Sequence, residues 1–270
     1  MTQKSRNLAG LWKTLNLVED YLSGGFSRAH PVLAIDETPA PTSAANAGPT
    51  QRAGVEPASA PSPTALARAL TPAPAVAPAP AETPAARLAL LQAIASEVSG
   101  CTRCALSANR KTTVPGEGSL DPPVLFIGEG PGADEDRTGR PFVGAAGQYL
   151  DTWLPPIGLE RQRCFIANVV KCRPPQNREP HPEEMTACFP YLLRQVEALR
   201  PKVICCLGRI AAQRLLGTTA SLGELRGRKH QWKGIPVVVT YHPSAVLRDK
   251  ASLRKPVWED LKLLKSILTG

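Results

Sequence analysis

The sequence predicts an α/β fold: a single domain with a central, mainly parallel four-stranded sheet flanked by helices, preceded by a disordered extension rich in Pro and Ala. Two observations carry this prediction. In the last two thirds of the 270 residues, short apolar runs rich in β-branched residues alternate with segments of helical period, an order typical of parallel strands with helices on both faces. In residues 37–84, large apolar side chains are too scarce to build a core.

Two segments are expected ahead of the domain. Residues 1–36 carry one helical stripe of apolar side chains, Leu8, Leu11, Trp12, Leu15, Val18 and Leu22. This stripe predicts either a short helix that docks on a protein partner or a marginal helix without a role, because isolated helices of this length are weak in water. Residues 37–85 are expected to be a disordered linker, because positions 37–84 include 11 Pro and 15 Ala and bury little surface against their ordering entropy.

Residues 86–270 are expected to form the folded domain. A helix is predicted over 87–98, where Gly100 can end it. The four strands are predicted at 124–128, 164–170, 203–207 and 236–240, and further helices at 144–154, 182–199, 209–216 and 257–268. Since ligand sites in such sheets gather at the carboxyl ends of the strands, the residues that follow each strand are the first candidates for a site.

Charge and hydropathy limit the function classes. The net charge of +9 falls entirely within residues 87–270, because the six basic and six acidic residues of 1–86 cancel. A basic domain attracts phosphate backbones, and a basic soluble protein without nucleic acid is the alternative. No apolar run reaches the length of about 18 residues that a membrane span needs, and the first residues do not read as a secretory signal. We therefore expect a cytoplasmic protein whose cysteines are thiols or metal ligands.

Four of the seven cysteines are spaced as ligands of a metal centre. Cys101 and Cys104 form a C-x2-C motif directly after the first helix, and Cys172 and Cys188 form a second, wider pair. Four thiolates from two segments can enclose a zinc ion or a four-iron cluster, and the spacing alone leaves both open, together with no metal at all. The other three stand within predicted strands and are expected to be buried in the core: Cys164, Cys205 and Cys206.

The segment after the first strand carries a glycine-rich turn and reactive side chains. It reads GEGPGADEDRTGRPFVGAAGQYLD over residues 128–151. Its glycines allow a sharp turn and a close approach to a ligand. No GK[ST] follows as in a Walker loop, and Pro131 interrupts a dinucleotide fingerprint. The segment also offers a carboxylate, Glu129, and an aromatic ring, Phe142.

Asn168 lies near the end of the second predicted strand, and His242 follows the last one. The amide of Asn168 offers one hydrogen-bond donor and one acceptor in a plane. His242 precedes a short turn within YHPSAVLR, residues 241–248. A lone histidine is more often structural than catalytic, but the strand order places this one at the same sheet edge as Glu129 and Asn168.

Together these motifs resemble the family 4 uracil-DNA glycosylases, the iron–sulfur branch of the uracil-DNA glycosylase superfamily. The resemblance runs from about Cys101 to Trp258 and leaves residues 1–86 outside. It rests on C-x2-C at 101–104, GEGPG at 128–132, GRPFVG at 139–144, N-x2-KCRPP at 168–175, Cys188 and HPS at 242–244. It implies an enzyme that flips uracil out of DNA and hydrolyses its N-glycosidic bond. It also implies a [4Fe–4S] cluster on Cys101, Cys104, Cys172 and Cys188.

The resemblance implies roles for the pocket residues. Phe142 should stack on the flipped uracil, and Asn168 should read its edge, whose O4 and N3–H match the donor and acceptor of the amide. His242 should hydrogen-bond uracil O2 as negative charge builds there. Glu129 should orient the attacking water or the group that holds it.

Several positions depart from related enzymes. Gly130 stands where family 1 enzymes carry a water-activating Asp, and Gly132 stands where they carry a bulky Tyr that excludes the thymine methyl. Glu135 is our candidate for closing that side of the pocket. Ala145 replaces an Arg often found after PFVG, so one DNA or loop contact is expected to be missing. His181 is expected to be a loop or helix-cap residue, and turnover to proceed without covalent trapping.

The expected partner is uracil-containing DNA, single- or double-stranded. The chain is expected to act as a monomer, away from membranes, in a bacterial-type cytoplasm and associated with the nucleoid. Leu247 should fill the gap that the flipped base leaves, with packing in the core as the alternative. Four polar residues should contact DNA: Ser244, Arg248, Lys250 and Arg254.

Two other functions agree with part of the pattern. The first is a non-catalytic iron–sulfur module that binds nucleic acid on the same fold. The complete set of Glu129, Phe142, Asn168 and His242 argues against it. The second is a zinc-stabilised adaptor whose N-terminal helix recruits a partner.

Overall fold

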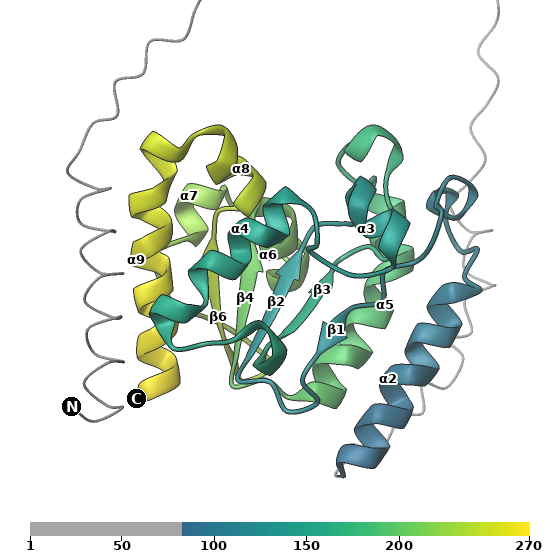
Figure 1. Cartoon of the computed structure of the whole chain (residues 1–270), viewed down its shortest axis with the longest axis horizontal. Coiled ribbons are helices and arrows are strands. Elements are labelled where there is room, and N and C mark those ends of the chain that lie inside the picture. The colour runs from purple at the N-terminus through teal and green to yellow at the C-terminus, as the bar shows by residue number, and fades with distance from the viewer. Residues whose placement is uncertain (1–82) are drawn as a thin grey trace, which may run out of the picture. The chain divides into compact units, whose positions relative to one another are not determined.

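The computed structural model describes residues 83–270 and shows a six-stranded sheet with helices on both faces (Figure 1). The strand order is β1-β3-β2-β4-β6-β5. The four central strands are parallel, and each edge strand is antiparallel to its neighbour. The α/β fold and the mainly parallel sheet are therefore confirmed, with two more strands than the four expected. The helix expected within residues 1–36 and the linker expected at 37–85, up to residue 82, lie outside the described residues.

The four central strands lie close to where the sequence places them. Their bounds are β2 Val124–Gly128, β3 Phe165–Asn168, β4 Val203–Leu207 and β6 Ile235–Thr240. β3 ends two residues earlier than expected, although Val169 and Val170 still bond to the last residue of β2 and to the residue after it. Their N–H groups donate to the carbonyl oxygens of Gly128, at 2.9 Å, and of Glu129, at 3.1 Å. These bonds tie the ends of β2 and β3 together beyond the sheet.

The two additional strands are short and lie at the edges: β1 Glu117–Gly118 and β5 His230–Trp232. Strands of two or three residues show no readable alternation of apolar and polar side chains, so the sequence pattern does not reveal them. β1 depends on Gly118, whose φ is +140°. A Cβ at this position would lie 2.0 Å from the carbonyl oxygen of Cys164.

Alternate residues of the central strands point into two separate cores, one on each face of the sheet. Leu125 and Ile127 of β2 belong to one core, and Val124 and Phe126 to the other. The first core is covered by α2 Pro84–Ser99, α5 Pro182–Leu199, α6 Arg209–Leu216 and α7 Leu222–Leu225. The second is covered by α4 Ala145–Trp153, α8 Pro243–Arg248 and α9 Lys250–Thr269. The sheet is therefore buried on both sides.

The other three cysteines are fully buried in these cores, as expected: Cys164 just before β3, and Cys205 and Cys206 within β4. Burial raises the pKa of the Cys164 thiol to about 11, so this group stays protonated and packs as a small apolar residue.

The helices differ from expectation mainly at their ends. α2 begins at Pro84, because the Thr83 hydroxyl accepts the N–H of Ala86 at 3.2 Å and caps the helix. α9 begins at Lys250 and not at 257, because Pro256 reads as a helix start but lies inside the helix. Several short elements were not expected. They are the 3-10 turns η1 Ala105–Ala108, η2 Pro155–Ile157, η3 Arg161–Arg163 and η4 Pro175–Asn177, and the short helices α3 Ala133–Thr138, α7 and α8.

The carboxyl ends of β2 and β6 lie at the upper edge in Figure 1, where α3 and α8 follow them. This is the edge at which parallel sheets of this class hold their ligands. Within residues 83–270, no helix is both long and apolar enough to cross a membrane.

Candidate active site

A cleft of about 410 Å³, partly open to solvent, lies at the carboxyl ends of β2, β3 and β6. The residues that line it come from segments far apart in the sequence: Glu129, Gly130, Pro131, Gly132, Glu135, Phe142, Ala146, Asn168, Pro174, Asn177, Arg178, His242, Ser244 and Arg248. The structure thus brings together every residue that the sequence analysis placed in the base pocket.

Asn168 is the last residue of β3 and is 1% exposed. Neither its Oδ1 nor its Nδ2 has a hydrogen-bond partner among the described residues. A buried polar group left without a partner costs about 1–3 kcal/mol, and Asn168 holds two such atoms at the cleft wall. The amide is therefore poised to bond a planar ligand that offers one acceptor and one donor.

The end of β2 packs tightly against the side chains of Asn168 and Phe142. Gly128 is aligned with Asn168 in the parallel β2–β3 ladder. A Cβ on Gly128 would lie 2.4 Å from Asn168 Oδ1 and 2.6 Å from the Phe142 ring. The absence of a side chain at 128 therefore lets the amide and the ring approach the strand end together.

Phe142 has a left-handed backbone with φ of +50°. For a residue with a bulky side chain this conformation costs of the order of 1–3 kcal/mol and persists only where the surroundings enforce it. One enforcing contact is α4, where a Cβ on Gly147 would lie 1.9 Å from the Phe142 carbonyl oxygen. The ring is 5% exposed, and its centroid lies 5.5 Å from that of the His242 ring. The strained backbone turns the ring into the cleft.

Glu135 ties the glycine-rich turn to the segment after Phe142. Its Oε1 accepts the N–H groups of Val143 and Gly144, each at 2.8 Å, and its Oε2 accepts the N–H of Gly132 at 3.1 Å. The carboxylate is 9% exposed and lines the cleft. Its oxygens are thus engaged in shaping the wall of the cleft.

Glu129 stands directly after β2 with a partly buried carboxylate. Burial raises its pKa, and the nearby charge of Glu179 raises it further, while Arg209 acts in the opposite direction. A carboxyl group whose pKa is raised binds protons more readily, which is typical of groups that handle a proton or a water in catalysis.

His242 caps the N-terminus of α8 and faces the cleft. Its Nδ1 accepts the backbone N–H of Ser244 at 3.1 Å and lies 2.8 Å from the Ser244 hydroxyl. Because a backbone N–H can only donate, the neutral ring carries its proton on Nε2. Burial lowers the pKa of His242 to about 4, with a further contribution from the charge of Arg248. The ring is therefore a neutral hydrogen-bond donor at physiological pH.

A wall of the cleft that the sequence analysis missed comes from the loop after Cys172. Pro174, Asn177 and Arg178 line the cleft, and Asn177 has a left-handed φ of +56°. Arg178 is held by two hydrogen bonds, of 2.9 and 2.7 Å, to the carboxylate of Glu184, which is almost fully buried. The PP pair indicates a fixed loop here, but nothing local signals that it returns to the cleft.

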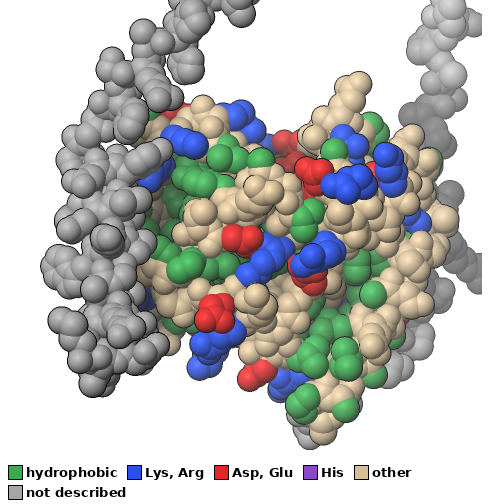
Figure 2. Space-filling model, viewed as in Figure 1, with side chains coloured by type: hydrophobic (Ala, Val, Ile, Leu, Met, Phe, Trp, Pro, Cys, Tyr) green, Lys and Arg blue, Asp and Glu red, His purple; other side chains and the backbone are tan. Residues whose placement is uncertain are grey.

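The residues expected to contact DNA lie around α8 and the start of α9. Ser244 and Arg248 line the cleft, and Lys250 is exposed beyond it. Leu247 is half-buried and belongs to neither core, and Arg254 is half-buried on α9. On the face shown in Figure 2, Lys and Arg side chains flank the upper edge, where Figure 1 places α3 and α8.

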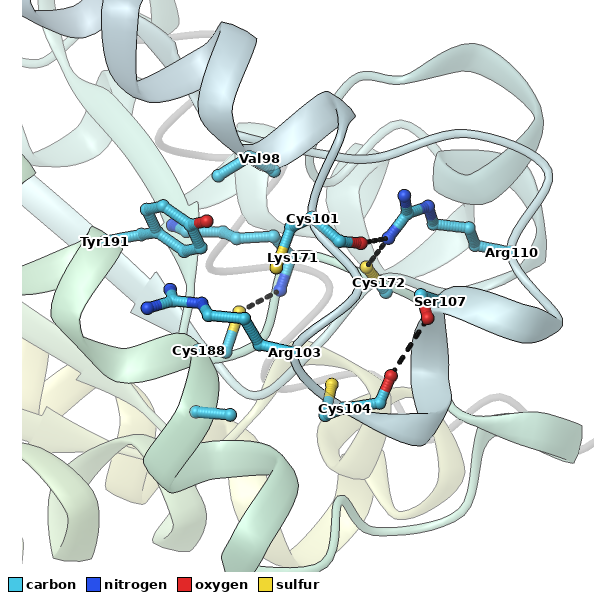
Figure 3. Close-up of a pocket in the computed structure, with 11 residues that line it drawn as sticks. Val98, Cys101, Arg103, Cys104, Ser107, Arg110, Lys171, Cys172, Cys188 and Tyr191 are labelled. Atoms are coloured by element: carbon cyan, nitrogen blue, oxygen red, sulfur yellow. Dashed lines mark hydrogen bonds between the residues drawn. The ribbon is translucent and has the colours of Figure 1, made fainter.

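A second, much smaller cavity is lined by Cys101, Cys104, Cys172 and Cys188 (Figure 3). The first two follow α2, the third follows β3, and the fourth lies in α5. All four paired cysteines of the sequence thus reach one cavity. Within residues 83–270, no three His, Cys, Asp or Glu side chains lie close enough to hold a single metal ion.

Cationic and N–H groups surround the sulfur atoms. Arg110 donates to Cys172 Sγ, and the backbone N–H of Lys171 donates to Cys188 Sγ, each at 3.2 Å. The ammonium group of Lys171 is fully buried and donates to Gln195 Oε1 at 2.7 Å. Burial raises the pKa of the Cys172 thiol and raises that of Cys188 to about 11, while these donors and charges act in the opposite direction, toward the thiolate form in which cysteine binds metals.

Comparison with known proteins places the cleft in a family. Residues 115–262, which include all residues lining the cleft, match the family model described as the uracil DNA glycosylase superfamily. The type-4 uracil-DNA glycosylase of Thermotoga maritima is 45% identical over 182 residues, which cover 66% of this chain and 95% of that protein. The type-4 uracil-DNA glycosylase of Pyrobaculum aerophilum is 46% identical over 181 residues, with 64% and 92% covered. The type-5 uracil-DNA glycosylase of Pyrobaculum aerophilum is 35% identical over 149 residues, with 48% and 65% covered.

The first prediction concerns the neutral state of His242. Between its ordinary pKa of about 6.5 and its pKa of about 4 in the fold, the unfolded chain binds a proton that the folded chain does not. The stability that the neutral ring contributes is therefore present above this window and is lost as the pH falls through it. When the pH is lowered from 7 to 4.5, the melting temperature of the wild type should therefore fall further than that of His242→Gln, whose side chain cannot titrate. Equal losses in the two proteins would contradict the assignment.

Proposed function

Because the chain belongs to the uracil-DNA glycosylase superfamily, and within it to the type-4 enzymes, it is a uracil-DNA glycosylase, and we propose that the cleft at the carboxyl ends of β2, β3 and β6 is where uracil is bound and released. The enzyme hydrolyses the N-glycosidic bond of deoxyuridine in DNA, which frees uracil and leaves an abasic site. Since C1′ is hidden within a duplex, the nucleotide must first be flipped out, at a cost of a few kcal/mol.

The unpaired amide of Asn168 is the observation that carries the assignment of the cleft. Its Nδ2 donates to uracil O4, and its Oδ1 accepts from N3–H. Cytosine presents the reverse pattern at these two positions, so the same amide discriminates against it. The base thereby supplies the two hydrogen-bond partners that the buried Asn168 amide lacks among the described residues.

Phe142 and His242 act on the face and the opposite edge of the base. The Phe142 ring stacks on uracil, and the Nε2–H of His242 donates to uracil O2. As the glycosidic bond stretches, negative charge grows on the base and positive charge on the sugar. A fixed neutral donor stabilises that developing anion without reorganisation, which is the main way enzymes lower such barriers.

Glu129, with the glycines that follow it, forms the side of the cleft where water attacks. Its carboxylate orients the water that adds at C1′, or the group that holds this water. Gly130 has no side chain to act on this water, and a Cβ there would lie 2.8 Å from the Val170 side chain. Glu135 closes the side of the pocket near Gly132, where a thymine methyl would enter.

DNA is held around the rim of the cleft. Leu247 fills the gap left by the flipped base, which agrees with its absence from both cores. Ser244, Arg248, Lys250 and Arg254 contact the phosphate backbone. Beyond DNA, the proposed partner is a protein that binds the helix expected in residues 1–36. The enzyme itself is proposed to be a monomer that acts in the cytoplasm, near the nucleoid.

The cysteine-lined cavity holds a [4Fe–4S] cluster in this proposal. Cys101, Cys104, Cys172 and Cys188 are its ligands, and the donor set agrees with the group: four sulfur atoms on one cavity with N–H donors and cations beside them. The cluster, when bound, supplies cross-links between α2, the end of β3 and α5.

The rival functions are less consistent with the site. A non-catalytic nucleic-acid-binding module would not need a buried amide without partners, which costs stability unless a ligand satisfies it. A zinc-stabilised adaptor would not need Asn168, Phe142 and His242 to converge on one cleft.

The second prediction concerns base recognition. Asn168→Asp keeps the shape of the side chain but presents acceptors only, so an ionised carboxylate at this position would repel uracil O4. We expect uracil release from a single-uracil oligonucleotide to fall at least ~100-fold, since an unpaired buried group costs about 1–3 kcal/mol and more when it is charged. Asn109→Asp is the control, because Asn109 is exposed and outside the cleft. Wild-type activity of Asn168→Asp would show that Asn168 does not read the base.

The third prediction concerns the metal centre. Cys188→Ser should abolish the iron content and the broad absorption near about 400 nm that distinguishes iron–sulfur clusters from colourless zinc. Cys205→Ser is the matched control, because it makes the same change at a buried cysteine outside the cavity. Iron loss in Cys205→Ser with iron retained in Cys188→Ser would overturn the proposed ligands.

A further inference from the structure

We propose that Arg161, which lies outside the cleft, is a positioning residue that holds the Phe142 ring against the flipped base. The inference rests on the proposed stacking role of Phe142 and adds the device that keeps the ring in place. Arg161 begins the 3-10 helix η3 and is not among the residues that line the cleft. It therefore acts on the reaction through Phe142 and not through contact with DNA or uracil.

The guanidinium of Arg161 binds the two backbone carbonyl groups on either side of the Phe142 Cα atom. Its Nη1 donates to the Phe142 carbonyl oxygen at 3.1 Å, and its Nη2 donates to the Pro141 carbonyl oxygen at 2.6 Å. These carbonyls flank the left-handed φ of Phe142, which is +50°. Two parallel bonds from one planar group fix the orientation of this turn as well as its position.

Two carboxylates hold the guanidinium in place from the other side. Asp151 of α4 accepts from Nη1 at 2.9 Å, and Glu117 of β1 accepts from Nη2 at 3.2 Å. Glu117 also accepts two bonds from Arg140, at 2.8 and 3.1 Å. The Arg161 side chain is 20% exposed, so the network is only partly screened by solvent. The network connects β1, α4, η3 and the segment before Phe142.

Contact with α4 explains how the Arg161 hydrogen bonds can hold the Phe142 backbone in place. The Phe142 carbonyl contacts both the α4 backbone, where a Cβ on Gly147 would lie 1.9 Å from its oxygen, and the Arg161 guanidinium. Without Arg161 the carbonyl can swing away from α4, and φ of Phe142 can relax to a negative value. The ring, which follows the backbone, would then leave the wall formed with Gly128 and Asn168.

The test compares Arg161→Ala with Arg163→Ala. Both residues lie in η3, and both variants lose one positive charge, so any general weakening of DNA binding is the same in the two. Arg163 is exposed and lies outside both the network and the cleft. We expect Arg161→Ala to lower kcat for uracil release at least ~10-fold with little change in KM, since small misplacements of a positioning group cost this much or more. Arg163→Ala should stay within about twofold of the wild type.

A double-mutant cycle with Phe142→Ala separates positioning from loss of stability. If Arg161 acts through the Phe142 ring, adding Arg161→Ala to Phe142→Ala should cost little further activity. Inhibition by free uracil should also weaken to a similar degree in the single variants Arg161→Ala and Phe142→Ala. Additive losses, or equal activity of Arg161→Ala and Arg163→Ala, would overturn the inference. If Arg161→Ala does not fold, Arg161→Lys serves in the same cycle, because one ammonium group cannot reproduce the paired bonds. Full activity of Phe142→Ala would refute the stacking role itself, which is a separate failure.

Discussion

The carboxyl end of β2 passes so close to Asn168 and Phe142 that only glycine can stand at position 128 without moving them. The parallel register aligns Gly128 with Asn168 and so brings the amide to the strand end. The left-handed turn at Phe142 then lays the ring over the same point. The pocket for a planar base therefore follows from one close contact between two strands and a strained turn. Glu135 and Arg161 hold that turn from its two sides.

The cleft and the cysteine cavity are joined by the chain that leaves β3. Asn168 ends the strand, and Cys172 follows four residues later. From there the loop lines the cleft with Pro174 and Arg178 before α5 carries the chain back to Cys188. The loop that forms one wall of the cleft thus connects Cys172 to α5 and Cys188, two of the proposed cluster ligands. In this arrangement a cluster contributes by fixing a wall of the pocket and needs no part in the chemistry.

The sequence reveals the parts of this structure that depend on local pattern, and it conceals those that depend on contacts between distant residues. β2 and β4 are continuous apolar runs bounded by turn residues, so their limits can be predicted. Asn168 and His242 could be placed at one edge because strand order determines which ends meet. The hydrogen bonds from Arg161 to the backbone around Phe142 could not be predicted from the sequence, because neither the backbone angle of Phe142 nor the ion pair with Glu117 leaves a periodic signal. The loop wall at Arg178 was missed for the same reason.

Uracil release by Gly128→Ala tests most directly whether this close packing sets the pocket. The added methyl group would meet the ends of the Asn168 and Phe142 side chains and not the backbone, so the fold and the iron content should survive while the pocket is displaced. We expect a loss of at least ~10-fold on a single-uracil oligonucleotide, since misplacement of about 1 Å can cost up to about 100-fold. Gly100→Ala, with no atom within 4 Å of the added group, should be silent. Wild-type activity of Gly128→Ala would contradict the account.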